Sequence, residues 1–132
     1  MAETELVAMP EDEFWDLVGV LGGSSDLKGF ELLTDALAKT DLDTVLAFQA
    51  RLTLALHALD SGCRAEWYRL NEPTHFGFVS DDVFLYSRCD TVVAGREVWQ
   101  EAVDSETLPW GTVDPTTGNG ESLLYVAGDA AD

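Results

Sequence analysis

Two arginines are the residues whose type and spacing could support chemistry. Arg88 falls on the same side of an expected helix as four residues that suit a core, at spacings of three or four. These four residues are Phe84, Val92, Gly95 and Trp99. Because an unpaired buried charge is costly, Arg88 must meet an acidic partner or a bound anion. Arg96 follows eight residues later, and the two guanidinium groups could together line a pocket for a carboxylate or phosphate.

Two interpretations of these arginines stay open. In the structural one, a carboxylate such as Asp16 or Asp82 holds Arg88, and Arg96 caps a helix end or pairs in the same way. In the functional one, Arg88 and Arg96 bind a ligand in a pocket beside Asp82 and Trp15. On one continuous helix the arginines would differ by about 80° in direction and by roughly 12 Å along the axis, a poor fit to one small anion. We therefore favour the structural interpretation.

Other arrangements that could do chemistry are weaker. His57, Asp60 and Cys63 are near one another in the chain, but a histidine beside an aspartate on a helix is usually only an ion pair. The Gly-Gly-Ser-Ser run at 22–25 lacks the lysine and the preceding strand of a phosphate-binding loop. The sequence has no Gly-x-Ser-x-Gly motif, and with 25 acidic residues some carboxylates must be close by chance. We therefore expect no catalytic residue, no metal and no cofactor.

The elements that position these residues are expected to be α-helices. Phe14, Leu17, Val18 and Leu21 recur with helical spacing after Pro10, and Gly22 and Gly23 end this first helix. Similar patterns predict helices over about 27–37, 42–60, 63–70, 80–94 and 98–103. Residues 122–127 are expected to form a short strand or a helical turn. The sum is an all-α fold of about five or six helices, with a short arm at 1–9 and one compact domain over 10–132.

The segment 108–120, LPWGTVDPTTGNG, is rich in turn residues and gives the C-terminal part a loop-rich character. Trp110 lies within this expected surface loop. It either folds back over the core, which we favour, or is exposed and anchors a partner protein.

Charge is the extreme feature of the composition. Seven basic residues stand against 25 acids, which gives a net charge of −18, and the acids are spread evenly along the chain. Such a surface disfavours direct binding to nucleic acid phosphates or to anionic lipids, because both depend on basic patches. It favours a basic protein partner, although a merely solvated acidic surface has the same composition. The best expectation is a non-enzymatic protein-binding or regulatory module, a class that includes inhibitor and immunity proteins. The alternative is an enzyme or small-ligand binder with a pocket around Arg88, Asp82 and Trp15.

The sequence also indicates a compartment. No apolar run approaches the roughly 18 residues of a membrane span. The acidic N-terminus does not have the pattern of a signal peptide, and Cys63 and Cys89 are too few and too far apart for a disulfide framework. We expect a cytoplasmic protein.

Two segments carry a family resemblance. One is the Phe14-Trp15 pair, and the other is the stretch 80–99, SDDVFLYSRCDTVVAGREVW. The chain resembles the bacterial domain-of-unknown-function family 4240 at the positions Ser80, Asp81, Asp82, Phe84, Arg88, Gly95 and Arg96. Ser87 and Asp90 stand where that family prefers aromatic residues. The resemblance implies a small, mainly helical bacterial protein and assigns no activity.

Overall fold

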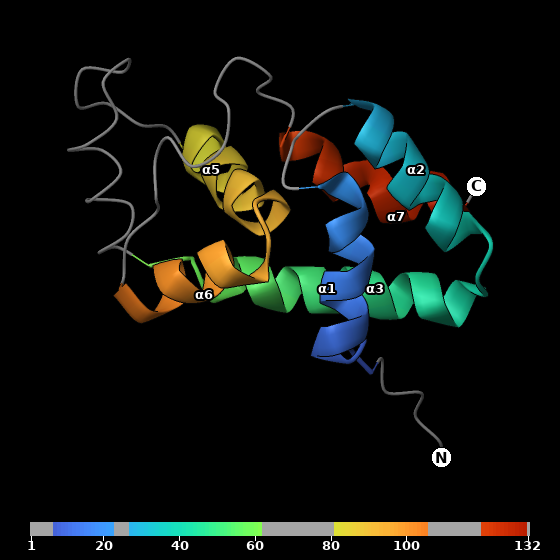
Figure 1. Ribbon diagram of the computed structural model, residues 1–132, viewed down its shortest axis with the longest axis horizontal. Helices are drawn as coiled ribbons and strands as arrows, with labels where there is room; N and C mark the ends of the chain where they lie inside the picture. Colours follow the sequence, from blue (N-terminus) through green and yellow to red (C-terminus); the bar gives the residue numbers. More distant parts are fainter. Residues whose placement is uncertain (1–6, 23–26, 62–80, 106–119, 132) are drawn as a thin grey trace.

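Every regular element in the part of the chain that the structure describes is a helix. The computed structural model describes residues 7–22, 27–61, 81–105 and 120–131, with the side chains of 81–84 and 120–121 excluded. These ranges contain α1 (Glu11–Val18), η1 (Gly19–Leu21), α2 (Leu27–Ala38), α3 (Leu42–His57), α5 (Asp81–Val93), α6 (Arg96–Ser105), η2 (Gly120–Tyr125) and α7 (Val126–Ala131) (Figure 1). The all-α prediction is therefore confirmed. The helix expected at 63–70, Trp110 and the loop before Gly120 lie outside the described residues.

The first helix follows the sequence pattern closely. Pro10 precedes α1, and three acids in its first turn lie at the positive end of the helix dipole. The expected helix tightens into the 3-10 turn η1 before it ends. It ends at Gly22, which has φ = 65°, a left-handed conformation that glycine adopts without the steric penalty of a Cβ.

A capping carboxylate fixes the start of α3. Asp41 Oδ1 accepts hydrogen bonds from the Thr44 backbone N–H at 2.8 Å and from the Thr44 hydroxyl at 2.7 Å. Asp41 is therefore the N-cap residue of α3. Thr40 instead donates to the carbonyl of Leu37, close to the end of α2, at 2.6 Å.

Gly95 separates α5 from α6. Its φ of 112° is incompatible with a continuing right-handed helix, so α5 ends at Val93 and α6 begins at Arg96. Gly95 therefore lies at the break between the two helices. Arg88 and Arg96 consequently lie on different helices, and the angular offset expected for one continuous helix does not apply to them.

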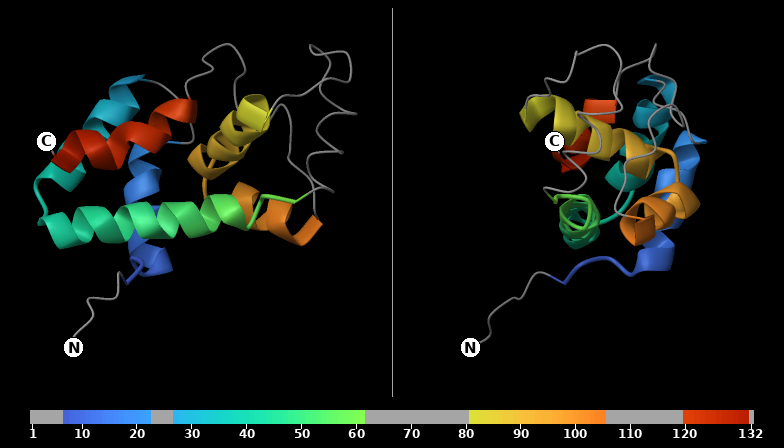
Figure 2. Two further views of the ribbon diagram at one scale, coloured as in Figure 1. Left: turned by 180° about the vertical axis from the view of Figure 1, so that it is seen from behind. Right: turned by 90° about the vertical axis from the view of Figure 1, so that its left-hand side faces the viewer.

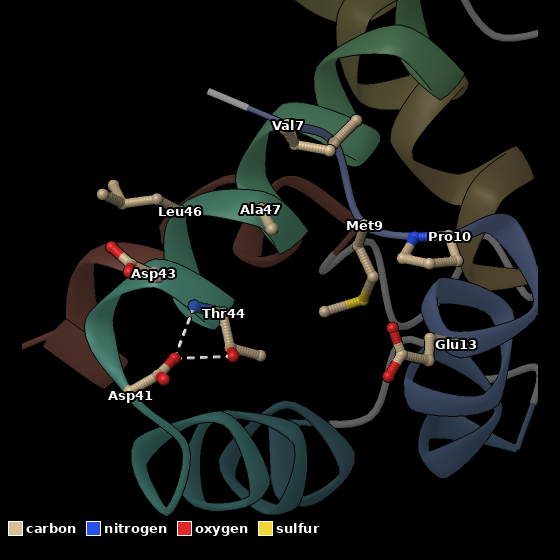
Figure 3. Close-up of a pocket in the computed structure, with 10 residues that line it drawn as sticks. Val7, Met9, Pro10, Glu13, Asp41, Asp43, Thr44, Leu46 and Ala47 are labelled. Atoms are coloured by element: carbon tan, nitrogen blue, oxygen red, sulfur yellow. Dashed lines mark hydrogen bonds between the residues drawn. The ribbon is translucent and has the colours of Figure 1, made fainter. Parts of the chain in front are cut away.

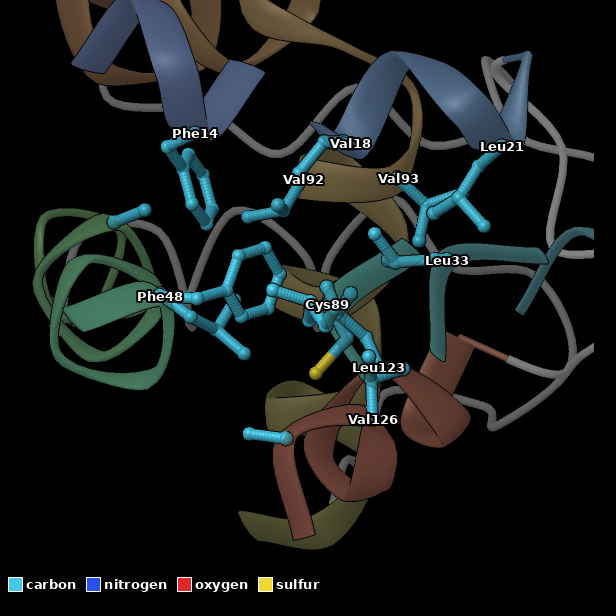
Figure 4. Packing of buried hydrophobic residues seen from close by; sticks show 14 of the residues in the cluster. Phe14, Val18, Leu21, Leu33, Phe48, Cys89, Val92, Val93, Leu123 and Val126 are labelled. Atoms are coloured by element: carbon cyan, nitrogen blue, oxygen red, sulfur yellow. The ribbon is translucent and has the colours of Figure 1, made fainter. Parts of the chain in front are cut away.

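The core lies between helices that cross rather than run parallel. In Figure 1, α1 crosses in front of α3, and the view from behind in Figure 2 shows α7 on the other side. α2 packs against α7, and α5 packs against η2 and α3. Phe14 of α1 meets Phe48 of α3 with ring centroids 5.1 Å apart, and the buried side chains of Cys89 and Leu123 complete this part of the core (Figure 4). The segment 122–127, expected as a strand or a helical turn, is helical.

α5 is enclosed on more than one side. Cys89, Val92 and Val93 are buried, and so are the polar residues Ser87 and Thr91. The Thr91 hydroxyl donates to the carbonyl of Ser87 at 2.9 Å, which satisfies this polar group within the helix. A single apolar stripe along α5 was therefore too simple a prediction.

Candidate functional site

Arg88 lies at the C-terminal end of α3. It is half-buried, and its Nη1 donates to the backbone carbonyl of Leu56 at 3.2 Å. The last carbonyls of a helix carry partial negative charge and lack partners within the helix. A guanidinium group placed there is stabilised much as it would be by an acid. One partner of Arg88 is thus a helix end, a contact that sequence reasoning did not anticipate.

Trp99 binds the same end of α3. Its indole Nε1 donates to the carbonyl of Ala55 at 2.9 Å. Because Arg88 comes from α5 and Trp99 from α6, two helices on either side of Gly95 contact adjacent carbonyls of a third helix. This geometry gives both residues a structural task.

Arg96 pairs with acids at the start of α1. Its Nη1 lies 2.7 Å from Asp12 Oδ1, and its Nη2 lies 3.4 Å from Glu11 Oε2. Arg51 of α3 also approaches Glu11, at 3.8 Å. This is the pairing that the structural interpretation describes, and it fastens α6 and α3 to α1. The two Arg96 pairs are exposed to solvent, so each contributes little to stability by itself.

Trp15 is largely buried in an aromatic cluster. Its ring lies 5.0 Å from that of Phe14 and 5.4 Å from that of Trp99. A hollow of about 170 Å³ lies beside it. Its described lining residues are Glu11, Phe14, Trp15, Arg51, Leu54, Ala55, Ala58 and Trp99. Arg88 is not in this set. The Asp82 side chain and Trp110 lie outside the described residues, so the grouping of Arg88, Asp82 and Trp15 stays a prediction.

A larger hollow lies between the N-terminal segment and α3, and we call it the N-terminal groove (Figure 3). Its volume is about 610 Å³. Its lining residues are Val7, Ala8, Met9, Pro10, Glu13, Asp41, Asp43, Thr44, Leu46 and Ala47. Of the site residues proposed from the sequence, the three whose side chains the structure describes, Trp15, Arg88 and Arg96, are not among its lining residues.

One wall of the groove is a segment without helical structure that is fixed to α3. The Met9 N–H donates to the carbonyl of Ala47 at 3.0 Å, and Arg51 Nε donates to the carbonyl of Met9 at 2.7 Å. Ala47 and Arg51 are one turn apart on the same face of α3, so together they bind both the N–H and the carbonyl of Met9. The Met9 side chain is only 3% exposed and belongs to the core. Met9, expected as the last residue of an arm, therefore lies against the helical body.

The groove combines acidic and apolar side chains. In Figure 3, the carboxylates of Asp41 and Glu13 lie on opposite sides of the hollow, with the Met9 side chain between them. Val7 and Leu46, 73% and 41% exposed, add apolar surface. The Thr44 hydroxyl and N–H lower the pKa of the Asp41 carboxyl from its ordinary value of 3.8, so Asp41 is ionised at neutral pH. The described lining contains no lysine or arginine. Such a surface can hold a cationic group beside an aliphatic one.

Sequence reasoning missed this groove for an identifiable reason. Its walls come from two segments that are distant in the chain, 7–13 and 41–47, and the packing of Met9 and α1 on α3 brings them together. The available signals were weak ones. Val7 and Met9 are apolar within an acidic segment, and Leu46 lies off the buried stripe of α3.

Metal and membrane sites find no support in the described part of the chain. Within it, no group of three or more His, Cys, Asp or Glu side chains could hold a metal ion. None of its helices combines the length and the hydrophobicity needed to cross a membrane.

The fold and its surface define a small, acidic, all-α protein. The chain belongs to the DUF4240 family, whose description is "protein of unknown function", and the match spans residues 9–132. The family resemblance at Phe14-Trp15 and at 80–99 is thereby confirmed. No curated protein and no solved structure matches the chain.

Proposed function

We propose that this protein is a non-enzymatic, cytoplasmic protein-binding module that engages a basic partner through the N-terminal groove. A regulatory or inhibitory role, like that of an immunity protein, belongs to this proposal. The observation that carries it is the composition of the groove, in which three exposed carboxylates surround apolar side chains and no basic residue is among the described lining.

The charge of the whole chain supports the same partner. A net charge of −18 attracts a basic protein over a long range and accelerates its encounter with the surface. Long-range attraction alone does not select a position. The groove supplies this selection, because its apolar surface rewards a partner that places an aliphatic side chain next to its lysine or arginine.

The arginines of the described residues support a binding surface rather than a catalytic one. Arg88 contacts the C-terminal end of α3, Arg51 holds Met9, and Arg96 pairs with Asp12. Each of these contacts stabilises the fold. The cytoplasmic part of the proposal rests on the sequence, since its two cysteines, Cys63 and Cys89, are too few and too far apart for a disulfide framework.

The test uses a fluorescently labelled synthetic peptide of alternating lysine and leucine, titrated with the full chain and followed by anisotropy. The double substitution Glu13→Gln and Asp43→Asn removes two groove charges without touching the capping residue Asp41. We expect it to weaken binding about tenfold, or about 1.4 kcal/mol.

The matched control is Glu101→Gln with Asp104→Asn, which removes the same charge from exposed positions on α6. We expect this control to change the affinity less than about twofold at physiological ionic strength, where the Debye length is about 8 Å. Equal losses for the two variants would show that bulk charge alone attracts the peptide, and would overturn the assignment to the groove.

A further inference from the structure

A second hollow lies between α2 and the C-terminal helices, and we call it the α2–α7 groove. Its volume is about 340 Å³. Its lining residues are Leu27, Phe30, Glu31, Thr34, Asp35, Ser122, Tyr125, Val126 and Asp129. It shares no lining residue with the N-terminal groove.

Large apolar side chains reach the solvent from two elements along this groove. Leu27 of α2 is 57% exposed and Tyr125 of η2 is 56% exposed. Phe30 and Val126 are buried and belong to the core beneath them. The groove therefore has an apolar floor that is anchored in the core and apolar groups that can close over an inserted side chain.

The charges along the groove have a single sign. Glu31 and Asp35 are four residues apart on α2, which places two like charges on neighbouring turns and destabilises a helix by a few tenths of a kcal/mol. Asp129 of α7 adds a third carboxylate, and the described lining contains no lysine or arginine. A cation supplied by a partner would relieve this repulsion.

We propose that the α2–α7 groove is a second docking site, and that its occupant is a basic amphipathic helix of a partner protein. An apolar side chain of that helix sits between Leu27 and Tyr125, and lysine or arginine side chains on the adjacent turns face Glu31, Asp35 and Asp129. The groove runs between helices and offers no strand edge within the described residues, so recognition depends on side chains rather than on main-chain pairing. With two separate grooves, one copy of this chain can hold two basic segments at once.

The experiment follows backbone amide shifts of the isotopically labelled full chain during titration with a synthetic helical peptide that has leucine on one face and lysine on the other. We expect shifts at 27–35 and 122–129. The double substitution Leu27→Ser and Tyr125→Ser should weaken the binding seen at these amides about tenfold. Both side chains are exposed in the wild type, so the helices should retain their structure.

Leu32 provides the matched control because it is also on α2 and 51% exposed, yet it does not line the groove. Leu32→Ser should leave the affinity within about twofold of the wild type. The proposal fails if the amides at 27–35 and 122–129 do not shift, or if Leu32→Ser weakens binding as much as the double variant does. Glu13→Gln with Asp43→Asn should leave binding at this groove unchanged, so the two docking proposals can fail separately.

Discussion

Arg88 shows how a charged residue at the edge of a helical core can stabilise the end of a neighbouring helix. Its guanidinium group lies at the end of α3, where it donates to Leu56, and Trp99 donates to the neighbouring carbonyl of Ala55. Both carbonyls belong to the last turn of α3, where helix carbonyls lack partners within the helix. The long apolar stem of Arg88 can pack beside the core while the charge stays at this helix end.

The first prediction concerns Arg88. Arg88→Met keeps the apolar stem but removes the charged hydrogen bond, and should lower the free energy of unfolding by about 1–2 kcal/mol. The stability of Arg88→Lys should lie between those of the wild type and Arg88→Met, because an ammonium group retains the favourable charge at the end of α3. Urea unfolding followed by circular dichroism measures both. A methionine variant as stable as the wild type would contradict this role.

At the scale of elements, the short links between helices determine which surfaces meet. Gly95 divides one sequence pattern into α5 and α6, and this break allows Trp99 to reach α3 while Arg96 reaches α1. At the other end of α3, Asp41 fixes the first turn and also lines the N-terminal groove. The turn at Gly95 and the cap at Asp41 therefore determine surface contacts as well as the ends of helices.

The second prediction concerns Gly95. A Cβ at this position would meet no atom within 4 Å, but φ = 112° is strained for any residue other than glycine. Gly95→Ala should therefore cost about 1–3 kcal/mol of stability through the backbone alone. Gly19→Ala is the matched control, since that position also has open space but a helical φ of −59°. It should stabilise the protein by about 0.5–1 kcal/mol. Thermal unfolding of the two variants measures both changes in stability. The prediction fails if both substitutions stabilise the protein or both destabilise it.

The third prediction concerns the pH dependence of Asp41. The pKa of its carboxyl is lower in the folded chain than its ordinary value of 3.8, so its charge stabilises the folded state above that value. This contribution should disappear as the pH falls below 3.8 and the folded carboxyl becomes protonated. Asp41→Asn keeps a capping oxygen but has no charge to lose. The difference in unfolding midpoint between wild type and variant should shrink towards zero over this acidic range, and a difference that grows would contradict the mechanism.

At the scale of the whole molecule, the charge that attracts a partner also opposes folding. A net charge of −18 in 132 residues creates self-repulsion, because seven basic residues cannot neutralise 25 acids. The cohesion of the fold must therefore come mainly from its apolar core, in which α1, α3 and α5 contribute Phe14, Phe48 and Val92.

The fourth prediction follows from this balance. Raising sodium chloride from about 0.01 M to about 1 M shortens the Debye length from about 30 Å to about 3 Å. Weaker repulsion should stabilise the chain by about 1 kcal/mol, or roughly 3–6 °C in the midpoint of thermal unfolding. Glu101→Gln with Asp104→Asn should show a smaller rise, because less repulsion remains to be screened. A midpoint that falls with added salt would mean that attractive pairs dominate.

The sequence predicted the elements better than the sites. Periodicity located α1 and α3, and Gly22 marked the end of the first helix, because these signals depend on neighbours a few residues apart. The site residues depend on pairings across the fold. Nothing near Arg88 in the chain points to Leu56, and nothing near Met9 points to Ala47, so the helix-end contact and the N-terminal groove required the structure. Because acids are spread evenly along the sequence, their positions did not indicate which of them line the two grooves.

The attachment of Met9 to α3 has a consequence for measuring the groove in solution. Met9 lies outside every helix, yet its N–H is hydrogen-bonded to the carbonyl of Ala47 and its side chain is buried. Deuterium can replace this proton only when the segment lifts away from α3. The exchange rate of one backbone amide therefore reports how often a wall of the groove opens, without any ligand being known. Slower exchange in the presence of a partner would identify that partner as one that closes the wall onto α3.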